Sequence, residues 1–414
     1  MSEVSRRGFL KFAGAAGIGS VIGSKVLAGS TSSTSSPQTD SNEPNGLKEQ
    51  SIQPLELPKR KLGKTGVEIP CLALGVAFNA VDNQIILRKA IDLGVTSWDT
   101  SSMYENGNSE LGIGKFIEKK PDVRKKLFLM TKASFAKNVE DVEKHLQASM
   151  GRMKTDYIDL YFGVHGLSSP AQLNDEMKKW AEKAKERKAI KYFGFSTHAN
   201  VAGCLMGASK LDWIDAVMPI YNFRVMQNQK LVDAVQACYD AGIGIIAMKT
   251  QAQKVESDND KKLMEHFSAK GFTEGQAKLK FVLDDKRVTA ACVGRENTEH
   301  LRQNVAAALD KKKLTQLDKE VLENYAAETC SGYCAGCANI CDSVAAGVPV
   351  SDIMRYLMYY NSFGDTQTAR QLFADIPQQT RDKILTVDYS AAESRCPQRL
   401  PVARLMSQAI RTLA

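Results

Sequence analysis

The chain has 414 residues, of which 43% are hydrophobic and 25% charged, and its formal net charge is +8 at pH 7. Residues 1–29 contribute three of those charges, because four basic residues there stand against one glutamate. At roughly 150 residues per domain, this length predicts one large domain or two ordinary ones. The sequence has no basic run and no interleaving of basic with aromatic residues, so it gives no sign of nucleic-acid binding.

The N-terminal segment carries a paired-arginine motif, SRRGFLK over 5–11, followed by a weakly apolar Gly/Ala run over 12–22 and small residues around Ala28. This pattern resembles a twin-arginine export signal. The apolar run is too short and too rich in Gly for a stable membrane span. We expect a signal peptide over 1–29 and a flexible Ser/Thr/Pro/Asn-rich linker over 30–57.

The resemblance to twin-arginine signals has two implications. Such substrates cross the membrane already folded, often because a cofactor was inserted in the cytoplasm. We therefore expect the twin-arginine translocase as a partner and a periplasmic or other extracytoplasmic location. A cofactor site is then expected further along the chain.

Strand-like and helix-like segments alternate from Lys61 onward. Eight such strands at roughly 30-residue intervals predict a (β/α)8 barrel over 58–328. The apolar stripes Val139, Val142, Leu146, Met150, Met153 and Leu231, Val235, Cys238, Tyr239 predict two of its helices. The predicted strands are Ile69 to Val76, Thr96 to Thr100, Leu127 to Lys132, Ile158 to His165, Tyr192 to Ser196, Ala216 to Tyr221, Ile243 to Lys249 and Thr289 to Val293.

Two nucleotide-binding motifs are incomplete. A doubly wound fold requires G-x-G-x-x-G at the start of a helix, and Gly112-Ile113-Gly114 is followed by Ile117 at the third glycine position. A P-loop around Gly63-Lys64-Thr65 would need glycine where Pro58 stands. We interpret 62–67 as a turn that leads into the first strand.

Polar side chains follow three consecutive predicted strands. Asp99 ends one strand with Tyr104 just beyond it, and Lys132 and His165 end the next two. In a barrel the C-terminal ends of the strands build the active site, so these four groups should face one mouth. Each alone fits a structural ion pair, a packing phenol or a core imidazole. Together at successive strand ends, they predict a catalytic site.

This constellation resembles the aldo/keto reductase family over residues 58 to about 325. Further motifs of the family follow in the family's order: RKLGKTG (60–66), WDTSSMY (98–104), LFLMTK (127–132), DYIDLY (156–161), GFS (194–196), YN (221–222) and VGRENTEHLRQN (293–304). The resemblance implies a (β/α)8 barrel, NADP or NAD as cofactor and a small-molecule carbonyl substrate.

The same resemblance implies a role for each of the four polar residues. Hydride delivery to a carbonyl creates an alkoxide that needs a proton, and a free phenol with a pKa near 10 is a reluctant donor. Tyr104 is implied as the general acid/base. Lys132 would lower the pKa of that phenol, Asp99 would hold Lys132 charged and oriented, and His165 would hydrogen-bond the carbonyl oxygen.

The implied cofactor contacts follow the family less closely. Ser196 matches the usual contact to the nicotinamide carboxamide, but Thr197 stands where Asn is common and Met218 where Gln often completes the contact. A thioether cannot replace an amide. His300 stands where a basic residue often reads the 2′-phosphate, so the choice between NADP and NAD stays open. Further cofactor-binding positions are implied at Tyr221, Gly294, Arg295, Asn297 and Asn304, the last four at a helix start that suits an anion.

The nine cysteines fall into two groups. Four are scattered through apolar segments and are interpreted as core residues: Cys71, Cys204, Cys238 and Cys292. The other five form Cys330-x3-Cys334-x2-Cys337-x3-Cys341 and a distant Cys396-Pro397. This spacing resembles a degenerate bacterial ferredoxin that retains one [4Fe–4S] cluster. Cys334, Cys337 and Cys396 are then ligands, with Cys330 or Cys341 as the fourth.

Other interpretations of these cysteines remain. Four thiolates also suit zinc, and disulfides could form after export. A radical-SAM site is disfavoured because the motif follows the barrel. Apolar faces at Ile353, Met354, Leu357, Tyr360 and at Val402, Leu405, Met406, Leu413 predict a small helical iron–sulfur domain over 329–414.

The sequence therefore predicts an exported aldo/keto reductase-like enzyme that reduces a carbonyl substrate with NAD(P)H, or runs the reverse reaction, and carries a 4Fe–4S cluster. The alternative is an electron-transfer or scaffold protein, served by a redox partner, whose barrel no longer turns over a nicotinamide cofactor.

Overall fold

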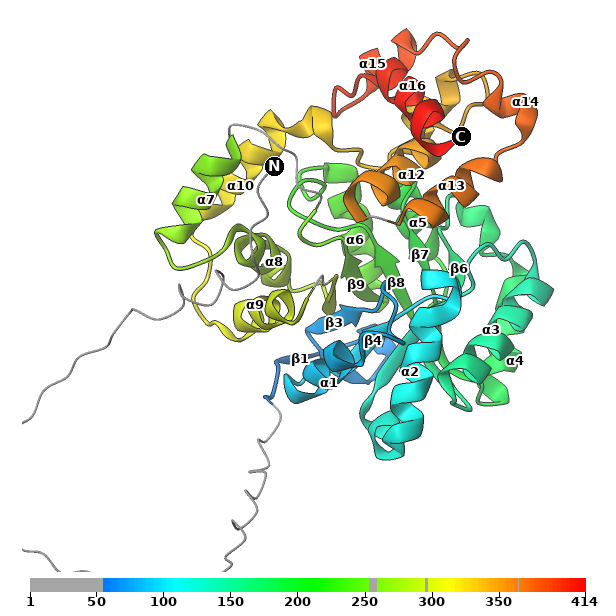
Figure 1. The fold of residues 1–414 in the computed structure, drawn as a ribbon, viewed down its shortest axis with the longest axis vertical. Helices are drawn as coiled ribbons and strands as arrows, with labels where there is room; N and C mark the ends of the chain where they lie inside the picture. Colours follow the sequence, from blue (N-terminus) through cyan, green and yellow to red (C-terminus); the bar gives the residue numbers. More distant parts are fainter. Residues whose placement is uncertain (1–54, 253–258, 295–296, 364) are drawn as a thin grey trace, which may run out of the picture. The chain divides into compact units, whose positions relative to one another are not determined.

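The structure is a computed structural model that describes residues 55–252, 259–294, 297–363 and 365–414. The predicted signal peptide and most of the linker lie outside the described residues. Eight parallel strands close into a barrel (Figure 1), which confirms the predicted (β/α)8 fold. In barrel order the strands are β10 (Ala290–Val293), β3 (Leu72–Gly75), β4 (Ser97–Asp99), β5 (Phe128–Lys132), β6 (Ile158–His165), β7 (Ile190–Thr197), β8 (Ala216–Pro219) and β9 (Gly244–Met248).

Helices cover the outside of this barrel. The first predicted stripe lies on α3, where Val142, Leu146 and Met153 are buried. The second lies on α6, but Tyr239 is 49% exposed and was wrongly assigned to its buried face. The helices are α1 (Gln84–Asp92), α2 (Asn108–Lys119), α3 (Val139–Met153), α4 (Asp175–Glu186), α5 (Val201–Ala208), α6 (Gln229–Asp240), α7 (Asn259–Ser268), α8 (Glu274–Asp284), α9 (Thr298–Leu309) and α10 (Gln316–Glu328).

The first predicted strand is two separate strands. Residues 69–70 belong to β2 (Glu68–Pro70), which pairs antiparallel with β1 (Lys59–Lys61), and only β3 enters the barrel. The turn between β1 and β2 packs against the barrel, with Leu62 fully buried. Gly63 has a φ of 51°, and a Cβ there would come within 2.2 Å of the carbonyl oxygen of Gly242. Only glycine fits this close approach.

The barrel core explains why the strands were visible in the sequence. Every residue of β3, β4, β5, β8, β9 and β10 is buried. Parallel strands covered on both faces appear in a sequence as nearly continuous apolar runs. The four scattered cysteines are all buried, as predicted.

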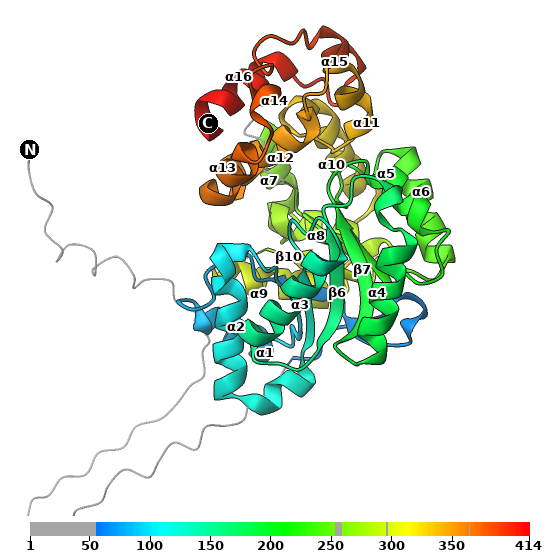
Figure 2. The same cartoon turned by 90° about the vertical axis from the view of Figure 1, so that its right-hand side faces the viewer.

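The C-terminal residues form six helices that appear in orange to red in Figure 2. They are α11 (Ala338–Cys341), α12 (Val350–Phe363), α13 (Thr366–Ala374), α14 (Gln378–Arg381), α15 (Ser390–Arg395) and α16 (Val402–Leu413). We call residues 329–414 the appendage. Its buried side chains, among them Ile353, Leu357 and Met406, form a hydrophobic cluster distinct from that of the barrel.

Hydrogen bonds join the appendage to loops at the C-terminal ends of the barrel strands. The Asn222 amide, just after β8, donates to the Tyr333 hydroxyl at 3.0 Å, and the backbone N–H of Asn200, after β7, donates to the Gly336 carbonyl at 2.8 Å. Asn106 donates to Gln367 at 3.0 Å. The cysteine-bearing segment therefore contacts the end of the barrel at which Asp99, Lys132 and His165 lie. Among the described residues, no helix is both long and apolar enough to cross a membrane.

Candidate active site

Asp99 and Lys132 form a buried ion pair at the ends of β4 and β5. The Lys132 Nζ donates to both carboxylate oxygens of Asp99 at 2.6 Å and to the Thr100 carbonyl at 2.6 Å. Burial raises the pKa of Asp99, although Lys132 and its hydrogen bonds act in the opposite direction. With three acceptors around one ammonium group, the pair is fully oriented and cannot swing away from the mouth.

Tyr104 lies beside this pair, with the Lys132 Nζ 5.0 Å from the centre of its ring. The pKa of Tyr104 is well above its ordinary value, because burial disfavours the phenolate and the charge of Asp99 adds to that effect. This differs from the prediction that Lys132 would lower the pKa of the phenol. Desolvation outweighs the ammonium here, since Asp99 already neutralises Lys132.

His165 is held in place by two serines. Its Nδ1 lies 2.6 Å from the Ser134 hydroxyl, which is 2.5 Å from the Ser101 hydroxyl. Burial and the nearby charge of Lys132 hold the pKa of His165 well below its usual range, so the imidazole is neutral at neutral pH. When Ser134 donates to Nδ1, the proton of the neutral ring sits on Nε2, where it can be donated to a substrate oxygen.

A second histidine follows β7. His198 is 6% exposed, its ring centre lies 6.0 Å from that of His165, and its Nδ1 makes no hydrogen bond to any described residue. Burial also holds the pKa of His198 well below its usual range. A buried polar atom without a partner is uncommon in proteins, and bound water or a ligand is one way to satisfy it.

The appendage reaches this group of residues through Tyr359 of α12. The Tyr359 ring lies 6.5 Å from that of His198 and 5.0 Å from the Lys249 Nζ. Lys249, after β9, donates to the sulfur of Met358 at 3.4 Å. Burial and the charge of Arg355 lower the pKa of Lys249 well below its ordinary value. Helix α12 therefore contributes side chains to the mouth of the barrel.

A cavity of about 590 Å³ lies between the barrel loops and the appendage. The barrel contributes Met103, Phe135 and His165 to its lining, and the appendage contributes Arg355, Tyr356 and Tyr359. This volume suits a small organic molecule. Of the four predicted catalytic residues, His165 is in this lining, and Asp99, Tyr104 and Lys132 are not.

The predicted carboxamide contacts lie on β7 and β8 at one level of the barrel. Ser196 is fully buried and pairs in register with Met218, which is 1% exposed. The Ser196 hydroxyl accepts from the Gly166 N–H at 3.3 Å. Thr197 donates to the carbonyl oxygens of Leu167 and Ala199, so its hydroxyl serves the loop structure.

The structure does not bring Tyr221 to the mouth. Its side chain is fully buried, and its hydroxyl donates to Asp285 at 2.8 Å while accepting from Arg287 at 3.2 Å. Asn222 beside it does reach toward the appendage, through Tyr333. The tyrosine at this position therefore supports the loop between α8 and β10 in this structure.

The predicted phosphate-binding positions surround the start of α9. Gly294 is exposed, and a Cβ built there would meet nothing within 4 Å. The Asn297 side chain caps the helix by accepting from the N–H groups of Glu299 and His300, both at 2.9 Å. Asn304 is buried and accepts from Gln251 at 2.9 Å. Arg295 lies outside the described residues.

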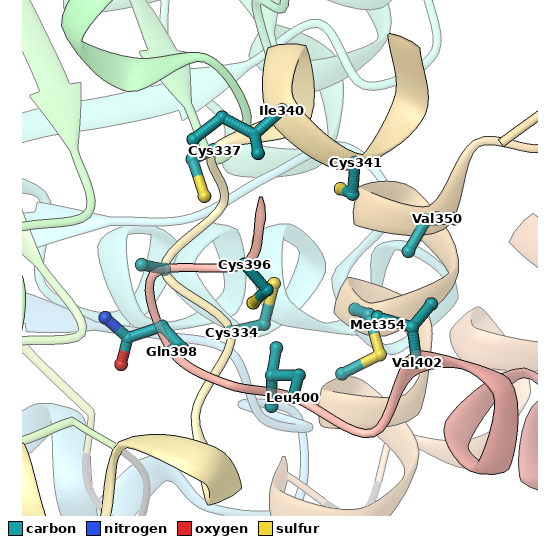
Figure 3. Close-up of a pocket in the computed structure, with 11 residues that line it drawn as sticks. Cys334, Cys337, Ile340, Cys341, Val350, Met354, Cys396, Gln398, Leu400 and Val402 are labelled. Carbon is teal, nitrogen blue, oxygen red and sulfur yellow. The ribbon is translucent and has the colours of Figure 1, made fainter. Parts of the chain in front are cut away.

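The C-terminal cysteines are not equivalent. Cys334, Cys337, Cys341 and Cys396 line one small cavity with apolar walls that include Met354 and Leu400. Figure 3 shows Cys337 and Cys341 at the two ends of α11, and Cys396 on the segment that leads to α16. Cys330 is not in this lining. Burial raises the pKa of Cys334 to about 12, and the neighbouring cysteines add to the rise.

Among the described residues, no three His, Cys, Asp or Glu side chains are arranged to hold a single metal ion.

Sequence reasoning missed Ser134, His198 and the α12 residues Arg355 and Tyr359. Ser134 follows Lys132 by two residues, so a polar residue just past a strand end was the available signal. His198 likewise follows the GFS motif by two residues. Nothing in the local sequence of α12 indicated that its side chains would contact the barrel. Arg355 and His165, for example, are about 190 residues apart in the chain.

A closed barrel with Asp, Tyr, Lys and His at one mouth defines a class of protein in which acid–base groups serve a carbonyl centre. The family model for the aldo/keto reductase family matches residues 73–321, more than half of the chain. This chain therefore belongs to the aldo/keto reductase family. The family and its named oxidoreductase members place it among NAD(P)-dependent oxidoreductases.

Several known proteins are similar to the chain. The NADP(+) aldo-keto reductase yakc of Schizosaccharomyces pombe is 31% identical over 213 residues, which are 46% of this chain and 60% of that protein. L-glyceraldehyde 3-phosphate reductase of Escherichia coli is 26% identical over 328 residues, covering 65% of this chain and 93% of that enzyme.

Solved structures show the same fold. The holo form of aldo-keto reductase AKR11C1 from Bacillus halodurans has a TM-score of 0.55 at 19% identity and covers 65% of this chain and 96% of its own. The thermostable aldo-keto reductase Tm1743, in complex with the inhibitor epalrestat, has a TM-score of 0.54 at 25% identity and covers 65% of this chain and 99% of its own.

Proposed function

We propose that this protein reduces a small-molecule carbonyl compound with NADPH or NADH at the mouth of the barrel. The observation that carries the proposal is the buried Lys132–Asp99 pair beside Tyr104, with the neutral His165 fixed through Nδ1 at the adjoining cavity. Named reductases among its relatives, including the NADP(+) enzyme of Schizosaccharomyces pombe, support the same chemistry.

Each residue has a defined task in this proposal. The Nε2–H of His165 donates to the carbonyl oxygen and positions it, and the Tyr104 hydroxyl donates the proton that the developing alkoxide takes. The raised pKa of Tyr104 keeps the phenol protonated at neutral pH, which is the state that reduction needs. Oxidation would need the phenolate, which burial disfavours.

A nicotinamide cofactor, when bound, supplies the hydride. The residues around α9 fit its phosphate end, because Gly294 is open and a helix start attracts anions. Ser196 can contact the carboxamide, while Met218 offers no hydrogen-bond partner. We therefore expect binding dominated by the phosphates, and weaker binding than a complete set of amide contacts would give.

Anaerobic titration of the full chain tests the proposal. We expect saturable binding of NADPH or NADH, and loss of its absorbance that depends on an added aldehyde. Absence of both binding and aldehyde-dependent oxidation would contradict the proposal. It would favour the second candidate, an electron-transfer or scaffold protein, for which Met218 and the position of Tyr359 at the mouth are the supporting observations.

We also propose that the appendage holds one 4Fe–4S cluster through Cys334, Cys337, Cys341 and Cys396. The four thiols share one apolar cavity, and burial raises the pKa of Cys334 and Cys337, so their thiolates need a cationic partner. A zinc ion held by the same four thiolates is the alternative, and it would give no visible absorbance. A cluster exchanges single electrons or serves as a structural link.

Serine substitutions test the ligand set. Cys341→Ser and Cys396→Ser should each lose most of the bound iron and the broad visible absorbance, and should make the appendage protease-sensitive. Cys330→Ser is the matched control and should keep both. Iron loss in Cys330→Ser together with full retention in Cys341→Ser would exchange the two roles, and zinc without visible absorbance would exclude the cluster.

Export through the twin-arginine translocase is the third part of the proposal, and it is supported by the SRRGFLK motif alone. Replacing both Arg6 and Arg7 by Lys should leave folded protein in the cytoplasm, whereas Lys25→Arg should be exported normally. Delivery of the double variant to the periplasm would show that the leader is not such a signal. A redox partner outside the cytoplasm is then expected for the cluster.

A further inference from the structure

The cavity at the barrel mouth has one wall from each part of the molecule. His165, which we assign to the carbonyl oxygen, lines it from the barrel, and Arg355 lines it from α12 of the appendage. A substrate whose carbonyl group lies against His165 therefore extends toward the appendage. The chemistry of that wall decides which substrates fit.

Arg355 is held close to His165. A Cβ built on Gly166, the residue after His165, would lie 3.2 Å from the Arg355 Nη1, so the guanidinium group rests on that turn. Its Nη2 donates to Asp352 at 2.9 Å, and its Cζ lies 5.3 Å from the centre of the Tyr356 ring. One face and one edge of the group are thus fixed.

The ion pair with Asp352 leaves other N–H donors of the Arg355 guanidinium group available. Arginine offers five N–H donors in a planar fork, and the buried Nε of Arg355 makes no hydrogen bond to any described residue. Leaving a donor buried without an acceptor costs free energy. The Nε–H of Arg355 is therefore available to an acceptor on a bound molecule.

The surroundings of His165 favour an anion as that acceptor. Three cations, Lys132, Arg355 and Lys249, each lower the pKa of His165, and no carboxylate has a counteracting effect among its causes. The same three cations lower the pKa of His198, whose Nδ1 also lacks a partner among the described residues. The His198 ring centre lies 6.0 Å from that of His165, and the Arg355 Nη1 lies against the turn that follows His165. The other charged residues in the lining are Lys137, Asp375 and Asp352, the partner of Arg355.

We propose that Arg355 binds a carboxylate group of the substrate, so that the appendage makes this enzyme selective for carbonyl compounds that carry a carboxylate. The inference rests on the proposed carbonyl reduction and names its substrate class. A guanidinium group is suited to this task because its fork accepts a carboxylate through two parallel hydrogen bonds. Lysine at the same place could supply charge but not the fork.

Two other roles for Arg355 use the same chemistry. The guanidinium could bind a phosphate of the nicotinamide cofactor, or it could serve only the fold through Asp352. The first predicts weaker cofactor binding without Arg355. The second predicts that loss of Asp352 and loss of Arg355 have the same effect.

The test is calorimetric titration of the full chain with para-carboxybenzaldehyde and with its neutral analogue, methyl para-formylbenzoate, beside NADPH. We expect the wild-type protein to bind the carboxylate roughly 10- to 100-fold more tightly than the ester, the range for hydrogen bonds to charged groups. Arg355→Ala should bind the two compounds equally, Arg355→Lys should keep part of the preference, and Asp352→Asn, which keeps an oxygen acceptor for Nη2, should keep most of it. The affinity for NADPH should stay the same in all three variants.

Each other outcome overturns the inference. No preference in the wild type, or an unchanged preference in Arg355→Ala, removes the carboxylate site. Equal losses in Asp352→Asn and Arg355→Ala assign the ion pair to the fold, and weakened NADPH binding in Arg355→Ala assigns it to the cofactor. Binding needs no turnover, so a carboxylate preference without any oxidation of NADPH would leave this site standing while refuting the proposed reduction.

Discussion

The barrel and the appendage are built in opposite ways. The barrel buries nearly continuous apolar strands on both faces, and its hydrophobic core holds together without a ligand. The appendage consists of helices of 4 to 14 residues around a much smaller core. That core adjoins a small apolar cavity lined by four thiols. Small domains of this kind usually need a crosslink, such as a bound metal or a disulfide, to be stable.

The same contrast appears in the candidate active site. The barrel supplies the acid–base groups at the ends of β4, β5 and β6, and hydrogen bonds within the barrel fix their positions. The appendage supplies Arg355 and Tyr359 to the cavity. In the proposed function, the barrel supplies the acid–base groups, and the appendage, for which we propose a cluster, supplies the wall that selects the substrate.

The largest expected effect concerns the acid in the barrel. Tyr104→Phe removes the proton donor and keeps the ring, so turnover of an aldehyde should fall on the order of 100-fold or more, with little change in cofactor affinity. Steady-state kinetics and NADPH titration measure the two quantities. Tyr239→Phe, at an exposed tyrosine of α6, is the matched control and should behave as the wild type. Unchanged turnover in Tyr104→Phe would remove this residue as the acid.

A smaller effect is expected at the serine that orients His165. Ser134→Ala removes the partner of Nδ1 and lets the imidazole adopt the wrong tautomer, which should lower kcat/KM roughly 3- to 10-fold. Ser149→Ala is a stringent control, since that buried serine has no hydrogen-bond partner among the described residues. The pH profile should separate orientation from folding, because only Ser134→Ala should shift the acidic limb. Equal behaviour of the two variants would refute the positioning role.

The smallest effect is a dependence of stability on pH. The folded-state pKa of His198 lies well below its ordinary value, so the unfolded chain binds the proton first as the pH falls. The stability conferred by the neutral ring is present above about pH 6.5 and is lost below it, at about 1.4 kcal/mol per pH unit. Urea unfolding between pH 5 and pH 8 should show a shallower slope for His198→Asn than for the wild type. Identical slopes would mean that His198 is already protonated in the folded protein.

Much of the barrel could be predicted because its signals are local. Each strand is a buried apolar run, and the polar residue at its end marks the active-site side, as Asp99, Lys132 and His165 show. The division of the first strand between β2 and β3 was missed because a hairpin and a barrel strand share one apolar stretch. The exposure of Tyr239 was missed because helical periodicity cannot distinguish the rim of a buried stripe from its centre.

The cavity could not be predicted because it depends on contacts between distant segments. The position of Arg355 is set by Asp352, Tyr356 and the turn at Gly166, and only the last belongs to the barrel. The raised pKa of Tyr104 could not be predicted because burial has no signature in sequence spacing. Conversely, the spacing of the cysteines predicted five candidate ligands, and the shared cavity, which includes Cys341 but not Cys330, is the ground for the ligand set that we propose.

The central claim is that the appendage, held together by the proposed cluster, completes the substrate site of the barrel. Its most direct test measures iron content and binding of para-carboxybenzaldehyde on the same samples of wild type, Cys341→Ser and Cys330→Ser. We predict that Cys341→Ser lacks iron, keeps the barrel folded, and binds the carboxylate at least about tenfold more weakly, because few molecules retain a closed cavity. Cys330→Ser should match the wild type in both measurements. Undiminished carboxylate binding by iron-free Cys341→Ser protein would contradict the claim.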